Sequence, residues 1–85
     1  MRFFCDGRQF DTAVMTDLNI SQGEFFGNRV LGLFLTEKSH RVFIWTQSVD
    51  TEVGEVWYEA TSDEVANFAQ RYRIRKLQKL VAHWG

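Results

Sequence analysis

The chain has 85 residues, of which 45% are hydrophobic and 25% are charged, and its formal net charge is −1. This composition excludes a disordered chain and predicts one small globular domain over residues 1–85. No apolar run is long enough to span a membrane, and no signal peptide is recognised. The single cysteine excludes an internal disulfide, so we expect a reducing compartment such as the cytoplasm.

Residues 2–11 predict a β-hairpin around Asp6-Gly7, which is a favoured pair for a two-residue type I′ turn. Beyond the hairpin, the second strand either continues towards Ile20 or breaks near Thr16-Asp17. The turn sets a register that pairs one aromatic residue with another and a basic residue with an acidic one. Such cross-strand pairs stabilise a hairpin. The expected pairs are Cys5 with Arg8, Phe4 with Gln9, Phe3 with Phe10 and Arg2 with Asp11.

A meander of strands is predicted next. Residues 21–24 form a turn cluster, and Gly27-Asn28 is either a bulge or a second tight turn. Strands follow at 29–37, 42–47 and 55–60, with a hairpin connection at 38–41 and a polar loop at 48–54. Gly32, inside the first of these strands, marks a bend or a close approach by a neighbour.

The two central strands are apolar on both faces. With a two- or four-residue hairpin loop, one face carries Leu33, Leu35, Val42 and Ile44, and the other carries Phe34, Thr36, Phe43 and Trp45. A three-residue loop would mix the two sets. We expect the C-terminal helix to dock on the aliphatic face.

Residues 61–84 predict one C-terminal helix, with Thr61 and Glu64 forming a capping box at its start. Its apolar residues fall on two stripes turned relative to each other, so its two halves are not expected to bury against the same surface. Either the helix kinks or curves over a twisted sheet, or its second half meets another chain.

The expected fold class is therefore α+β, a small antiparallel sheet of about five strands (hairpin plus meander) packed by one C-terminal α-helix. One helix covers only one face of a sheet, so the other face needs a second cover. The first hairpin could supply it as a partial barrel. A second copy of the chain or a different protein are the alternatives.

The expected function follows from that surplus of apolar surface. We expect a non-enzymatic protein-interaction module, of the small inhibitor or adaptor type, that binds a protein partner or forms a homodimer. The expected contact residues lie on the aromatic sheet face and the second half of the helix: Phe34, Phe43, Trp45, Ile74, Leu77, Val81 and Trp84.

Charge suggests an alternative function. Residues 1–70 carry eleven acidic and five basic groups, whereas residues 71–85 carry five basic groups and no acidic one. Either this basic end is an interaction tail, or it neutralises the acidic body within the fold. A stripe of Arg71, Arg75 and Lys79 on one helical face, with Lys76 beside it, predicts possible contacts to anions or nucleic acid. The sequence pI of about 6.1 opposes nucleic acid.

No pattern indicates catalysis, a cofactor or a metal site. His40 is expected in a surface loop and His83 in the last helical turn, and with Cys5 they lack the spacing of zinc ligands. Arg8, opposite Cys5, could lower the pKa of the thiol, although a half-buried apolar role for Cys5 is the simpler interpretation. The acidic pairs Glu55/Glu59 and Asp50/Glu52 are expected to be solvated surface charges rather than catalytic carboxylates.

Overall fold

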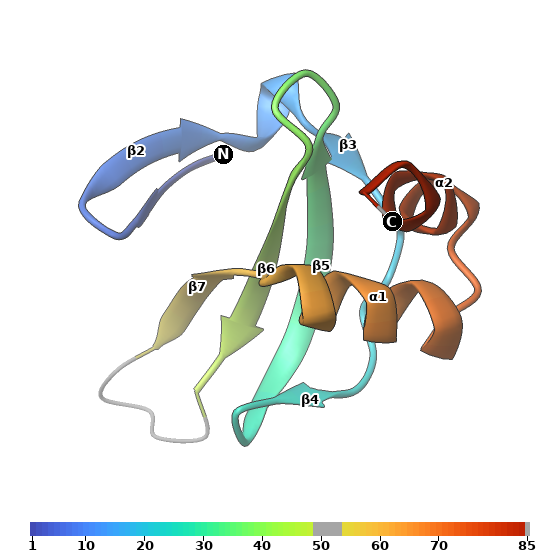
Figure 1. Cartoon of the computed structure of the whole chain (residues 1–85). Coiled ribbons are helices and arrows are strands. Elements are labelled where there is room, and N and C mark those ends of the chain that lie inside the picture. The colour runs from blue at the N-terminus through green and yellow to red at the C-terminus, as the bar shows by residue number, and fades with distance from the viewer. Residues whose placement is uncertain (49–53, 85) are drawn as a thin grey trace.

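The computed structural model describes residues 1–48 and 54–84, and it confirms the predicted α+β class (Figure 1). The predicted polar loop lies largely outside the described residues, as does the carboxylate pair Asp50/Glu52. The elements are β1 (Arg2–Cys5), β2 (Arg8–Asp11), a short 3-10 helix η1 (Thr12–Val14), β3 (Thr16–Asp17), β4 (Glu24–Phe25), β5 (Asn28–Thr36), β6 (Arg41–Gln47), β7 (Glu55–Glu59), α1 (Ser62–Arg71) and α2 (Arg75–Trp84).

The described residues form two antiparallel sheets. Strands β1 and β2 form a hairpin of their own, and the other five strands form one sheet in which β3, β5, β6 and β7 lie in that order and β4 pairs with β5. The predicted register of the first hairpin is confirmed throughout. Asp6 and Gly7 both have positive φ angles (52° and 76°), as a type I′ turn requires.

The second strand of this hairpin ends at Asp11, earlier than either predicted course. The Asp11 side chain accepts a hydrogen bond from the backbone N–H of Ala13 at 3.0 Å and so caps η1. This bond is the main cause of a lowered pKa for Asp11. The chain then enters the five-stranded sheet at β3, where Thr16 pairs with Leu35.

The hairpin of β5 and β6 has a four-residue loop, residues 37–40, closed by the pair Thr36–Arg41. This loop length places the aliphatic and aromatic residues on opposite faces, as predicted. The register shifts between Val30 and Gly32, and a Cβ added at Gly32 would lie 3.0 Å from the Phe34 ring. Gly32 therefore borders an irregularity in the strand and lies at a close approach.

The tight turn between β4 and β5 has Phe26 and Gly27 at its centre, with φ angles of 50° and 76°. Of the two alternatives predicted at Gly27-Asn28, a tight turn is present, but it is centred one residue earlier, because Asn28 already pairs with Phe25 in β5. The first turn position, where Asn or Gly is usual, is taken by an exposed phenylalanine.

The C-terminal segment contains two helices rather than the single helix predicted. The capping box is confirmed. The Thr61 hydroxyl accepts a hydrogen bond from the Glu64 backbone N–H at 3.2 Å, and the Glu64 carboxylate accepts one from the Thr61 backbone N–H at 2.8 Å. Helix α1 ends at Arg71, and Arg73 adopts a left-handed conformation with φ of 53°. This turn lets both apolar stripes face one core, so the prediction of two separate burial surfaces is wrong.

That core lies between the aliphatic sheet face and both helices, which confirms the predicted docking face. It contains Val30, Leu33, Leu35, Val42, Ile44, Val65, Phe68, Ala69, Leu77 and Leu80. In Figure 1, α1 and α2 lie on the same side of the molecule, with α2 seen end-on. The Gln78 amide donates to the Ala69 carbonyl at 3.3 Å and joins the two helices.

Candidate functional site

The aromatic sheet face is covered by the first hairpin. Phe3 stacks on Trp57 with ring centroids 3.6 Å apart, and it contacts the Phe43 ring edge-on at 5.4 Å. The Arg41 guanidinium pairs with Glu59 at 2.7 and 2.9 Å and lies over the Phe10 ring. The hairpin therefore supplies the second cover, but as a separate two-stranded sheet and not as a closed barrel.

This cover changes the set of expected contact residues. Phe43 and Leu77 have no exposed surface, and Phe34 is also buried. Leu77 packs in the aliphatic core, Phe43 packs with Phe3 and Cys5 in the aromatic cluster, and Phe34 contacts the Trp57 ring at 5.6 Å. Their burial contradicts the expectation that these three residues touch a partner. Trp45 is half-buried and stacks on Trp57 at 5.7 Å. The Trp45 indole N–H is buried and has no hydrogen-bond partner among the described residues.

Cys5 belongs to the same aromatic cluster, where its thiol donates to the Trp57 carbonyl at 3.8 Å. Burial is the largest cause of a raised pKa for this thiol, and the Asp6 charge adds to it. The Arg8 guanidinium lies over the Phe10 ring at 5.9 Å. The hypothesis of a thiol activated by Arg8 is therefore wrong, and Cys5 is a buried apolar residue.

The remaining expected apolar contacts are on α2 and beside it. Ile74 and Val81 are half-buried and pack against the aliphatic core, whereas the side chain of Trp84 is 42% exposed. Sequence reasoning missed two more exposed aromatic side chains, Phe4 (70%) and Phe26 (75%). Side chains alternate along a strand, so Phe4 points to the face opposite to that of the buried Phe3. Its exposure could therefore have been predicted from the sequence.

The basic stripe is interrupted by the turn at Arg73. Arg71 ends α1 and Arg75 begins α2, so the expected single helical face does not exist. Arg75 and Lys79 remain one turn apart on α2. Of the five basic residues from 71 to 79, Lys76 alone forms an ion pair within the described part of the chain, with Glu37 at 2.6 Å.

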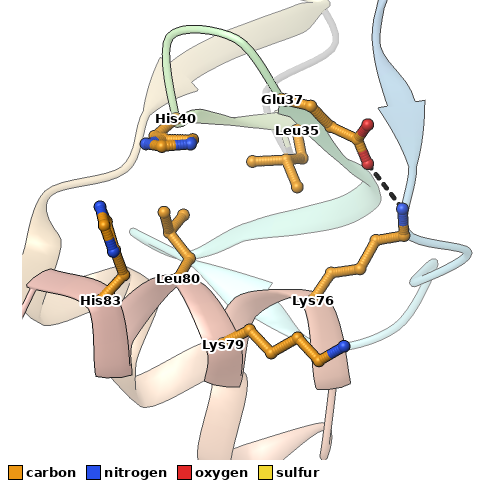
Figure 2. Close-up of a pocket in the computed structure, with 7 residues that line it drawn as sticks. All are labelled: Leu35, Glu37, His40, Lys76, Lys79, Leu80 and His83. Atoms are coloured by element: carbon orange, nitrogen blue, oxygen red, sulfur yellow. Dashed lines mark hydrogen bonds and ion pairs between the residues drawn. The ribbon is translucent and has the colours of Figure 1, made fainter.

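A cleft of about 460 Å³ lies between α2 and the loop of residues 37–40 (Figure 2). Its lining residues are Leu35, Glu37, His40, Lys76, Lys79, Leu80 and His83. The imidazoles of His40 and His83 face each other with ring centroids 5.9 Å apart. No sequence signal indicated this cleft, because the two histidines are far apart in the chain and neither belongs to a motif.

The cleft does not assemble a recognisable catalytic group. Cys5 is absent from it, and the Glu37 carboxylate is engaged by Lys76, whose hydrogen bond lowers the pKa of Glu37. No group of three or more histidine, cysteine or acidic residues suited to a metal ion occurs in the described residues.

Among residues 1–48 and 54–84, no helix has the length and apolar character needed to cross a membrane.

Comparison with known proteins finds no matching family model, no matching curated protein and no matching solved structure.

Proposed function

We propose that this protein is a non-enzymatic protein-interaction module, of inhibitor or adaptor type, that binds an acidic surface of another protein. The contact surface is the basic end of the chain, formed by the last turn of α1, the turn at Arg73 and the exposed side of α2. One observation carries the proposal: Arg71, Arg73, Arg75 and Lys79 are exposed and form no ion pair with any described carboxylate.

The alternative explanation of these charges is neutralisation of the acidic body within the fold. That explanation requires several ion pairs between residues 71–79 and the rest of the chain. Only the pair of Lys76 with Glu37 occurs among the described residues, and both of its side chains are more than half exposed. Exposed pairs of this kind contribute about 0–1 kcal/mol, so internal neutralisation is a weak explanation for five basic residues.

An apolar anchor lies on the same helix. Trp84 is 42% exposed at the end of α2, and Val81 is half-buried one turn earlier. Tryptophan and arginine are the residues that most often dominate the energy of protein interfaces. A partner with an apolar pocket surrounded by acidic groups fits this combination.

The charge distribution favours a different protein over a second copy of this chain. A two-fold dimer through α2 would place like charges opposite each other. A contact between the basic end of one copy and the acidic body of the next is head-to-tail, which builds rings or filaments instead of a dimer. The single cysteine supports a reducing compartment such as the cytoplasm for this encounter.

Nucleic acid is the second candidate partner, since the unpaired guanidinium and ammonium groups also suit phosphates. The acidic groups of residues 1–70 oppose it, because they repel a polyanion that extends beyond the basic end. The two candidates can be separated with defined probes.

The experiment is fluorescence anisotropy with a labelled peptide of Glu-Glu-Leu repeats and with single- and double-stranded DNA. We expect the double variant Arg71→Glu/Arg75→Glu to lose peptide binding. The matched control is Arg8→Glu/Arg29→Glu, which makes the same change in net charge at two exposed positions outside the basic end. Equal losses in both variants would refute the proposal, and DNA binding that depends on Arg71 and Arg75 without peptide binding would replace it with the second candidate.

A further inference from the structure

Beyond a macromolecular partner, we propose that the cleft between α2 and the loop of residues 37–40 binds a small organic phosphate, meaning a phosphate monoester carried on an apolar body. The site shares Lys79 with the basic end but none of its arginines, and it does not depend on the protein-binding proposal. Its volume of about 460 Å³ lies within the range of about 300–1,000 Å³ that is usual for small-molecule sites.

The floor of the cleft suits the apolar body of such a ligand. It is formed by Leu35 at the end of β5 and Leu80 on α2, both of which belong to the aliphatic core and are largely buried. Because the sheet and the helix are packed together at these residues, the floor is preformed. A ligand body placed there would cover apolar surface without rearranging the fold.

The rim of the cleft suits the phosphate. His40 and His83 approach from the loop and from the last turn of α2, with their rings at 75° to each other. His40 has a left-handed backbone with φ of 55°, a conformation that histidine tolerates better than most residues. The two imidazoles can each donate an N–H to a phosphate oxygen. The Lys79 side chain extends towards the other end of the cleft (Figure 2), where its charge favours a dianionic phosphate over a singly charged carboxylate.

Charge in the cleft also favours an anion. At the end away from the histidines, Lys76 neutralises Glu37 across 2.6 Å, as the dashed line in Figure 2 marks. Lys79 has no carboxylate partner among the described residues, so the lining is net positive even when both imidazoles are neutral. Two imidazoles are also ligands for divalent cations, but the two ammonium groups that line the same cleft oppose a cation, and no third ligand joins the imidazoles in the described chain.

The test is a titration of the ¹⁵N-labelled protein with phenyl phosphate, followed by NMR, with inorganic phosphate, benzoate and benzyl alcohol as comparisons. We expect phenyl phosphate to shift the signals of residues 35, 40, 80 and 83 and to bind more tightly than the other three compounds. His40→Ala and His83→Ala should each weaken binding about tenfold, the value of one hydrogen bond to a charged group. Lys38→Ala is the matched control, since Lys38 is an exposed neighbour in the same loop that does not line the cleft.

A gain of affinity provides a second readout. Glu37→Gln removes the carboxylate that Lys76 neutralises, so phenyl phosphate should bind about threefold more tightly to this variant. The proposal is overturned if the shifts are absent from the cleft, if inorganic phosphate binds as tightly as phenyl phosphate, or if the histidine variants bind like wild type. Zinc binding that His40→Ala abolishes, without any response to phenyl phosphate, would identify a metal site instead. The peptide assay uses different variants, so each proposal can fail alone.

Discussion

The substitution Phe3→Ala tests whether the first hairpin is held over the sheet by its aromatic contacts. Phe3 is one of three buried residues of the second core, with Cys5 and Phe43, and it stacks directly on Trp57. Truncating a buried phenylalanine costs about 3–5 kcal/mol. A chain of this length has a total stability of about 4–13 kcal/mol, so the loss is a large fraction of the whole.

The neighbouring residue supplies a matched control. Phe4 lies on the same strand and points to the opposite side, with 70% of its surface exposed. Phe4→Ala removes the same atoms from a solvated position, and we expect its free energy of unfolding to stay within about 0.5 kcal/mol of wild type. The difference between the two variants therefore isolates the contribution of the covered aromatic face.

Urea unfolding followed by tryptophan fluorescence measures both variants, and Trp57 reports on the contact directly. With the hairpin loosened, Phe43 becomes accessible, so Phe3→Ala should also bind an apolar dye or associate with itself. If Phe3→Ala and Phe4→Ala lose similar amounts of stability, or if Phe3→Ala loses less than about 0.5 kcal/mol, the hairpin is not the cover that these contacts indicate.

Three further residues, Arg73, Thr46 and Cys5, test other parts of the fold. Arg73→Gly should raise the free energy of unfolding measured in urea by about 0.5 kcal/mol. Glycine avoids the cost of the left-handed φ of 53°, and this gain exceeds its greater loss of chain entropy on folding. A decrease would show that the Arg73 side chain stabilises the turn. Thr46→Val should lower the urea midpoint by the equivalent of about 1 kcal/mol. The reason is that the buried Thr46 hydroxyl donates a hydrogen bond to the Val56 carbonyl at 2.8 Å. An unchanged midpoint would show that this hydrogen bond does not stabilise the fold. The raised pKa of Cys5 means that the native thiol should react more slowly with Ellman's reagent than the unfolded chain does. It also means that stability should fall as the pH rises above the ordinary thiol value of 9.0. Cys5→Ala should abolish this part of the pH dependence, and an identical pH profile in that variant would refute the assignment.

The parts of the fold that could be predicted are those set by neighbouring residues. The Asp6-Gly7 turn determined the register of the first hairpin, and Thr61 and Glu64 determined where α1 begins. Both depend on backbone conformation and hydrogen bonds within a few residues. The alternation of β5 and β6 assigned the two faces correctly once the loop length was known.

The missed features depend on contacts between distant segments. Nothing in the sequence around Arg73 marks a helix end, since that segment contains neither glycine nor proline. The helix breaks there because both apolar stripes can then reach the same core, which outweighs the cost of one left-handed residue. The pairing of His40 with His83 follows from that packing, as α2 is placed beside the loop of residues 37–40.

The sequence by itself determined the first hairpin, the three long strands, the first helix cap and the surplus of apolar surface on the sheet. Only the tertiary structure decided how that surplus is covered, which side chains stay exposed and which basic residues lack a partner. The physical reason is the sequence distance over which each interaction acts. Turns and caps are fixed by steric limits and hydrogen bonds between near neighbours, whereas the burial of apolar surface joins distant segments and is non-directional. Several covers would satisfy the same pattern, and the choice among them is made by the packing of the whole chain.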